Sequence, residues 1–117
     1  SGAVVVMDET TDVVAAAHRI VRFFAHESCG QCTPCREGTT WLEQVLRRIL
    51  DGQGRSADLD LLLDISDNIS PGLRWPPAMT TICPLGPSAV SPVTSVLRHF
   101  RDEVEAMIPL DQGVPVG

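Results

Sequence analysis

Cys29-Gly-Gln-Cys32-Thr-Pro-Cys35 holds three of the four cysteines of this chain, and the fourth, Cys83, stands directly before Pro84. Thiolates spaced three residues apart converge on three irons at the corners of a cubane, and a distant loop then supplies the fourth ligand. The spacing therefore predicts a [4Fe–4S] cluster. We expect its ligands to be Cys29, Cys32, Cys35 and Cys83.

Two other uses of the cysteines stay open at this point. Four thiolates also satisfy a tetrahedral zinc ion in a docking domain, although zinc sites usually draw their ligands from two Cys-x2-Cys pairs. Two disulfides are a weaker alternative, because a chain of 117 residues can fold without cross-links. The three clustered cysteines are also poorly spaced to bridge one another. The three-plus-one arrangement suits a cubane better than either alternative.

The composition indicates one compact helical domain. Aliphatic residues supply nearly all of the apolar content, since aromatic residues make up 4% of the chain and Tyr is absent. The formal net charge of −6 argues against a nucleic-acid partner, because no basic surface is available to neutralise phosphates. No apolar run is long enough to cross a bilayer, and residues 1–7 lack the basic leader of a signal peptide. We expect no membrane insertion and a reducing, cytoplasmic location.

Apolar residues recur at helical spacing in four segments. These segments predict helices over residues 10–26, 37–50, 57–69 and 92–107. Asp8 or Thr10 is placed to cap the first helix, and Ser91-Pro92 is a strong start signal for the last. Trp41 falls on the expected apolar side of the second helix. The fold class is therefore all-α, a small four-helix bundle with a cluster-binding loop between its first two helices.

A short β-branched run, residues 3–7, precedes the first predicted helix and has the composition of a strand. One strand cannot form a sheet alone, so we expect a remnant of a preceding β-rich domain over residues 1–9. The helical [4Fe–4S]-binding domain then occupies residues 10–108. Residues 109–117 are expected to form a flexible tail.

Three stretches of the sequence resemble one known family. The run from His26 to Gly38, His-Glu-Ser-Cys-Gly-Gln-Cys-Thr-Pro-Cys-Arg-Glu-Gly, is similar to the cluster-binding signature of the NADH-binding flavoprotein of respiratory complex I, its F or 51 kDa subunit. Residues 81–86, Thr-Ile-Cys-Pro-Leu-Gly, and residues 97–100, Leu-Arg-His-Phe, resemble the second cluster segment and the final helix of that family. NAD-linked hydrogenases and formate dehydrogenases share this pattern.

The resemblance implies a [4Fe–4S] electron-transfer domain of NADH:quinone oxidoreductase, which passes electrons from reduced FMN to further clusters. The chain has no Gly-rich phosphate cradle, so FMN and NADH are expected only in the full-length parent subunit, and the fragment alone should not oxidise NADH. The implied partners are the upstream FMN/NADH domain and other peripheral-arm subunits, on the cytoplasmic face of the inner membrane in a bacterium. The chain departs from the family pattern at Pro84, Pro87 and Ser91.

The remaining polar residues give no catalytic constellation. Neither a Ser-His-Asp set nor paired carboxylates can be recognised, so hydrolytic chemistry has no support. His18, His26 and His99 are expected to be surface or capping residues, and His26 is the best placed to hydrogen-bond near a thiol. Arg36 either lies in solvent at a helix start, or it offsets the negative charge of the cluster or contacts a partner subunit.

Overall fold

The structure is a computed structural model that describes residues 4–72 and 78–109. Five helices make up the regular structure of these residues. Their order along the chain is α1 (Val13–Glu27), α2 (Thr33–Leu50), α3 (Ala57–Ile69), α4 (Leu85–His99) and α5 (Arg101–Ala106). No strand occurs in the described residues. The prediction of an all-α fold is confirmed.

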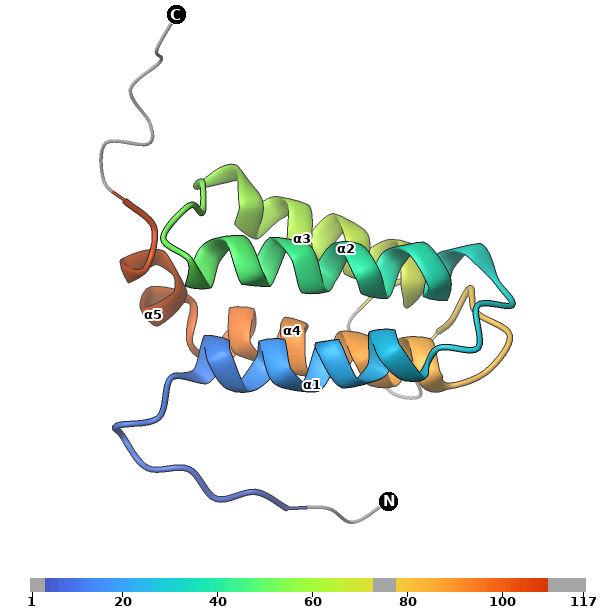
Figure 1. The fold of residues 1–117 in the computed structure, drawn as a ribbon, viewed down its shortest axis with the longest axis horizontal. Coiled ribbons are helices and arrows are strands. Elements are labelled where there is room, and N and C mark those ends of the chain that lie inside the picture. Colours follow the sequence, from blue (N-terminus) through green and yellow to red (C-terminus); the bar gives the residue numbers. More distant parts are fainter. Residues whose placement is uncertain (1–3, 73–77, 110–117) are drawn as a thin grey trace, which may run out of the picture.

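The four long helices surround one core (Figure 1). α1 packs against α2 and α4, and α3 packs against the same two helices from the other side. The short α5 continues from α4 and packs against it. Within the described residues, none of these helices combines the length and the apolar character needed to cross a membrane.

The core is aliphatic, as the composition predicted. Each long helix contributes side chains that are almost completely buried, among them Val21, Leu42, Ile49, Leu62, Ile69 and Val93. Burying one such side chain stabilises the fold by about 1.5–3 kcal/mol. The expected core position of Trp41 is wrong: this side chain lies on the outer face of α2 and is 55% exposed.

The first helix begins at Val13 rather than at residue 10, because Asp12 is its N-cap. The Oδ1 of Asp12 accepts hydrogen bonds from the backbone N–H groups of Val14 and Ala15, each at 3.0 Å. Asp8 holds a separate turn, accepting a bond from the N–H of Thr10 at 3.0 Å. The predicted caps Asp8 and Thr10 are therefore corrected to Asp12.

The second helix also differs from its predicted start at residue 37. α2 begins at Thr33, with Pro34 in its first turn. Proline is tolerated there because the first backbone N–H groups of a helix have no partner within the helix. This earlier start places Cys35 inside α2 rather than in the preceding loop. The third helix, Ala57–Ile69, agrees with its prediction.

The predicted last helix, 92–107, is wrong at its start and in its continuity. α4 begins at Leu85 and carries Pro92 in its interior, and a bend at Phe100 separates it from α5. The Pro92 nitrogen has no hydrogen, so the helix forgoes one backbone bond. Burial offsets this loss, because Ala89 and Val90 in the added turns are 0% and 4% exposed. Tertiary packing thus extends α4 beyond the local start signal.

The N-terminal arm does not form the predicted strand over the residues that are described. Residues 4–7 have no regular hydrogen-bonding partner, and their four apolar side chains are exposed. Residue 3, which also belonged to the prediction, lies outside the described residues, as do residues 110–117 of the predicted tail. The proposed domain boundaries therefore stay predictions.

Candidate metal centre

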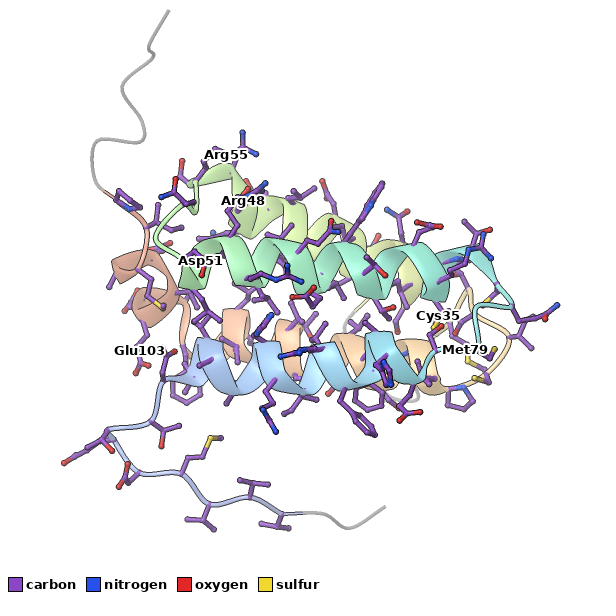
Figure 2. All side chains as sticks on the ribbon, viewed as in Figure 1. Cys35, Arg48, Asp51, Arg55, Met79 and Glu103 are labelled. Atoms are coloured by element: carbon purple, nitrogen blue, oxygen red, sulfur yellow. The ribbon has the colours of Figure 1, made fainter. Side chains whose placement is uncertain are left out.

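The four cysteines belong to two segments at one end of the bundle. Residues 28–32 join α1 to α2, and residues 78–84 lead into α4; both lie at the end where α2 and α4 begin (Figure 1). Cys35 and Met79 mark this end among the side chains (Figure 2). Segments far apart in the sequence are therefore brought to the same end of the molecule.

The cysteines differ in burial, although all four are free thiols. Cys32 is the N-cap residue of α2 and is half-buried, and Cys35 follows in the first turn with 6% exposure. Cys29 and Cys83 are exposed. The site therefore has one buried member and two exposed members.

The donor set fits an iron–sulfur cluster in its chemistry, since cluster irons are held by Cys thiolates. In the described part of the chain, no three His, Cys, Asp or Glu side chains lie close enough together to hold a metal ion. Cys29 and Cys83 stand on non-helical segments, which can adjust more easily than a packed helix. Metal binding and the folding of such loops are generally coupled.

Hydrogen bonds from neighbouring side chains shape the cysteine loop. The Oγ of Ser28 lies 3.1 Å from the Sγ of Cys35 and accepts a bond from the N–H of Gly30 at 3.3 Å. Gly30 has φ +77°, a conformation that favours glycine. The guanidinium of Arg36 donates to the Gly30 carbonyl at 2.8 Å. Arg36 thus braces the loop, a contact that neither expectation for this residue included.

The segment that carries Cys83 is tied to the end of α3. The backbone N–H of Thr80 donates to the Ile69 carbonyl at 3.0 Å, and its hydroxyl donates to the Asn68 carbonyl at 2.6 Å. The hydroxyl of Ser70 donates to the Ala78 carbonyl at 2.5 Å. The two Thr80 bonds satisfy carbonyls at the end of α3, which have no partner within the helix. Together with the Ser70 bond, they hold the start of the segment 78–83 against the C-terminal end of α3.

Close packing restricts the backbone immediately beyond this point. The hydroxyl of Thr81 donates to the Cys83 carbonyl at 2.7 Å, and Thr81 is buried. A Cβ on Gly86 would lie 2.5 Å from the Cγ2 of Thr81 and 2.9 Å from the Cγ2 of Ile69. Only glycine allows α4 to approach this closely. Gly86 is thus a supporting residue whose packing role the sequence did not reveal.

The electrostatics of this end favour negative charge. α2 and α4 both begin here, and neither has a side-chain N-cap bond or an acidic residue in its first turn. The free N–H groups at a helix N-terminus carry a partial positive charge. Four thiolates around a cluster give a net negative charge, which these two helix ends would stabilise if a cluster were bound here.

The three histidines lie outside this site in different ways. Nε2 of His18 lies 2.6 Å from Oε2 of Glu43, joining α1 to α2, so the prediction of a surface or capping role is wrong for His18. His26 lines a shallow groove on α1 with Arg19, Arg22 and Phe23, and no bond from it to a thiol occurs among the described residues. His99 is exposed at the end of α4.

Two buried carboxylates are ion-paired away from the cysteines. Burial alone would raise the pKa of Glu43, but its hydrogen bonds to Arg47 and His18 outweigh burial and hold this pKa below its ordinary value. Burial would likewise raise the pKa of Asp58, but bonds from Arg48 and from the Arg55 backbone lower it. Arg48 Nε donates to Asp58 Oδ2 at 3.0 Å. These pairs support the bundle rather than the site.

Comparison with known proteins finds relatives among subunits of respiratory enzymes. The chain is 42% identical over 114 residues to the F subunit of NADH-quinone oxidoreductase from Rickettsia conorii, covering 97% of this chain and 25% of that protein. It is 44% identical over 108 residues to the mitochondrial NADH-ubiquinone oxidoreductase 51 kDa subunit of Neurospora crassa, covering 92% of this chain and 20% of that protein. The chain therefore spans a fifth to a quarter of these relatives.

A solved structure shares the fold. The crystal structure of an NAD+-reducing [NiFe]-hydrogenase in its H2-reduced state matches with a TM-score of 0.77 and 36% identity, covering 89% of this chain and 16% of the other. A family profile for the NADH-ubiquinone oxidoreductase-F iron-sulfur binding region matches residues 15–107, which include all four cysteines. The match favours an iron–sulfur cluster over the zinc and disulfide alternatives. This chain belongs to that family, whose cofactor is a [4Fe–4S] cluster.

Proposed function

We propose that Cys29, Cys32, Cys35 and Cys83 hold one [4Fe–4S] cluster, and that the chain relays electrons within a larger NADH-oxidising enzyme. The observation that carries this proposal is the gathering of both cysteine segments at the bundle end where α2 and α4 begin. A cluster bound there would supply one-electron transfer. The surrounding residues set how easily it is reduced and how far water reaches it.

The protein contributes three supports to such a cluster. The Ser28 hydroxyl is within hydrogen-bond reach of the Cys35 sulfur. Arg36 fixes the backbone at Gly30, between the first two ligands. Thr81 fixes the backbone carbonyl of Cys83. Each contact orients a ligand or its neighbour, as the outer shell of a metal site commonly does.

The family and the length of its relatives support a proposal for the partners of this domain. Because the chain covers a fifth to a quarter of those subunits, we place the FMN and NADH sites in the remaining part of the parent subunit. Electrons would arrive from reduced FMN there and leave to other peripheral-arm subunits, on the cytoplasmic side in a bacterium. The similarity to the NAD+-reducing hydrogenase supports one second candidate, the equivalent domain of such an enzyme.

Anaerobic reconstitution tests the ligand assignment. The chain should bind iron and sulfide in equal amounts and show visible absorption that dithionite bleaches. Cys83→Ser should lower the iron content, because one of the four thiolates is lost. Ser91→Ala, an exposed change on the helix that follows Cys83, is the matched control. Full iron content and absorption in Cys83→Ser would refute the assignment of Cys83.

A second experiment tests whether reduction by NADH requires the remaining part of the parent subunit. The reconstituted chain should accept electrons from dithionite but not from NADH, with or without added FMN. Absorbance is followed anaerobically against a protein-free flavin control. Bleaching that titrates with NADH and exceeds the control would show that this chain itself contains the nucleotide site.

A further inference from the structure

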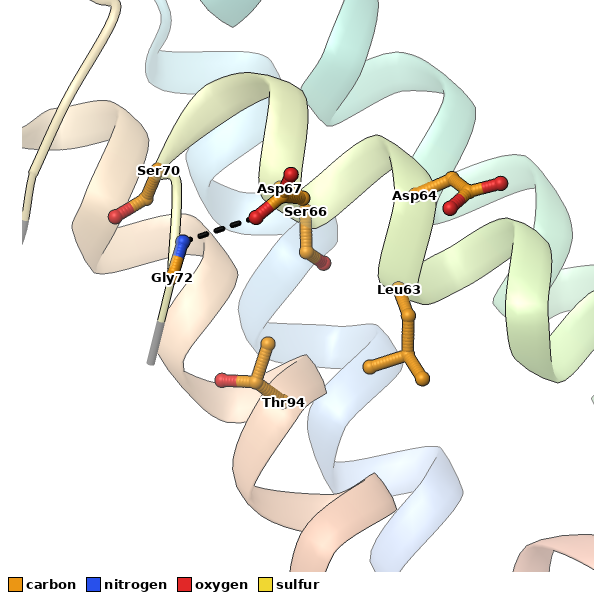
Figure 3. A pocket seen from close by; sticks show the side chains of 7 residues that line it. All are labelled: Leu63, Asp64, Ser66, Asp67, Ser70, Gly72 and Thr94. Carbon is orange, nitrogen blue, oxygen red and sulfur yellow. Dashed lines mark hydrogen bonds between the residues drawn. The ribbon is translucent and has the colours of Figure 1, made fainter. Parts of the chain in front are cut away.

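A second site lies between α3 and α4, separate from the cysteines. It is a pocket of about 270 Å³, formed by residues of the second half of α3, the turn after it, and Thr94 of α4 (Figure 3). The side chains of Ser66 and Thr94 turn toward each other across it (Figure 3). Asp64 and Asp67 are exposed on the same stretch of α3: the carboxylate of Asp67 turns toward Gly72, and that of Asp64 points away from Ser66 (Figure 3).

Ser66 is the most unusual residue of this pocket. It is only 2% exposed, and its hydroxyl has no hydrogen-bond partner among the described residues. An unpaired buried hydroxyl costs about 1–3 kcal/mol, so this exception calls for an explanation, and a bound group is one. One water occupies about 30 Å³ in the liquid, so the pocket has room for a much larger group.

The other polar groups of the pocket offer acceptors rather than donors. The Ser70 hydroxyl donates to the Ala78 carbonyl, with 2.5 Å between the oxygens. The Thr94 hydroxyl donates to the Val90 carbonyl at 3.3 Å. Among the described residues Asp67 accepts one bond, from the N–H of Gly72 at 2.9 Å, and its second oxygen accepts none. Neither Asp64 nor Asp67 has an ion pair in the part of the chain that the structure describes. The pocket therefore suits a cation that donates hydrogen bonds.

The shape and the donor set favour an organic cation over a metal ion. No metal-binding group of three His, Cys, Asp or Glu side chains occurs in the described residues. Leu63 lines the same pocket and provides an apolar surface for an aliphatic stem. A guanidinium has five donors and no acceptor, and its planar fork matches a carboxylate beside a hydroxyl better than the point charge of an ammonium does.

We propose that this α3–α4 pocket receives an arginine side chain from a partner polypeptide. Asp67 pairs with the guanidinium, and Asp64 adds negative charge on the same stretch of α3. The Ser66 hydroxyl accepts one guanidinium hydrogen, and the methylene stem lies on Leu63. The net charge of −6 attracts a basic partner. The relatives of this chain are named as subunits of larger enzymes, which supports a partner polypeptide as the source of the arginine. This inference does not depend on the cysteine ligand assignment.

A titration of the reconstituted chain with N-acetyl-arginine amide, followed by amide NMR, tests the proposal. Saturable shifts are expected at Ser66 and Thr94, with a Kd on the order of 1 mM for a single residue. Asp64→Asn combined with Asp67→Asn should weaken binding about tenfold. Asparagine keeps an acceptor for the Gly72 N–H, so the turn is retained. Asp60→Asn, an exposed change on α3 outside the pocket, should leave the Kd unchanged.

Ser66→Ala supplies a readout independent of charge. It should raise the Kd of the arginine probe about threefold. The ligand-free variant should be at least as stable as the parent chain, because the hydroxyl has no partner to lose among the described residues. Residue 74 lies outside the described residues, so the titration is repeated with Arg74→Ala. An affinity gain in that variant would assign the pocket to the chain's own arginine and overturn the proposal.

Four further outcomes would overturn it. Equal shifts with N-acetyl-norleucine amide would show an apolar groove without charge recognition. Equal affinity for N-acetyl-lysine amide would remove the role of the guanidinium fork. Saturable shifts of the Ser66 and Thr94 backbone amide signals with Mg²⁺, at a concentration lower than the arginine probe needs, would assign the pocket to a metal ion. Absence of any saturable shift at Ser66 and Thr94 would also contradict the proposal.

Discussion

At the residue scale, the contact between Ser28 and Cys35 links the loop to the redox property of the site. The 3.1 Å distance allows the hydroxyl to donate to a cluster-bound sulfur, which stabilises the reduced state because that state is more negative. Ser28→Ala should therefore lower the midpoint potential. A hydrogen bond of about 1 kcal/mol corresponds to roughly 40 mV for a one-electron couple.

The potential of the Ser28→Ala variant is measured by redox titration with electron paramagnetic resonance. Ser95→Ala, an exposed change of the same kind on α4, is the control and should leave the potential unchanged. A potential in Ser28→Ala that equals the parent value, with full iron content, would show that the hydroxyl does not act on the cluster.

At the scale of elements, the packing of α4 against α3 holds the Cys83 segment. A Cβ at position 86 would meet Thr81 at 2.5 Å and Ile69 at 2.9 Å, and both neighbours are buried. Alanine is normally the better helix former by about 1 kcal/mol, yet overpacking here reverses the sign. Gly86→Ala should destabilise the chain by about 1–3 kcal/mol in urea unfolding and lower its iron content.

The matched control for this variant is Ser88→Ala, which adds no atoms to α4 near Thr81. Ser88 is exposed, and its hydroxyl bonds only to the Pro84 carbonyl among the described residues. It should change stability by less than about 1 kcal/mol. If Gly86→Ala proved as stable as the parent chain, the close approach of α4 to Thr81 would be incorrect.

At the scale of the whole molecule, the paired carboxylates make stability depend on pH. The pKa values of Glu43 and Asp58 are lower in the folded chain than their ordinary values of 4.5 and 3.8. The folded state therefore binds fewer protons, and this stabilisation is complete above those values and is lost as the pH falls through the folded pKa. Asp58→Asn should cost about 2–3 kcal/mol at pH 7.

The test compares the free energies of unfolding of Asp58→Asn and the parent chain between pH 7 and pH 3. The difference removes the contribution of the acid-labile cluster, which both proteins share. It should stay constant down to about pH 4.5 and narrow below that. Glu103→Gln, an exposed change on α5, should show no such difference. A constant difference down to pH 3 would contradict the role assigned to Asp58.

The sequence by itself determined the features that depend on local pattern. Helical periodicity predicted an all-α fold, and α3 agrees with its predicted bounds. The spacing of the cysteines predicted the cluster chemistry that the family match supports. These features can be recognised from the sequence because a helix and a Cys-x2-Cys-x2-Cys loop are specified by residues close together in the chain.

Tertiary structure alone decided what depends on residues distant in sequence. α4 begins at Leu85 because burial outweighs the start signal at Pro92, and Trp41 lies outside the core although its helical position is apolar. His18 meets Glu43 across two helices, and Gly86 meets Thr81. No local pattern encodes these contacts, since they arise only when separate helices pack and bury polar groups that must then find partners.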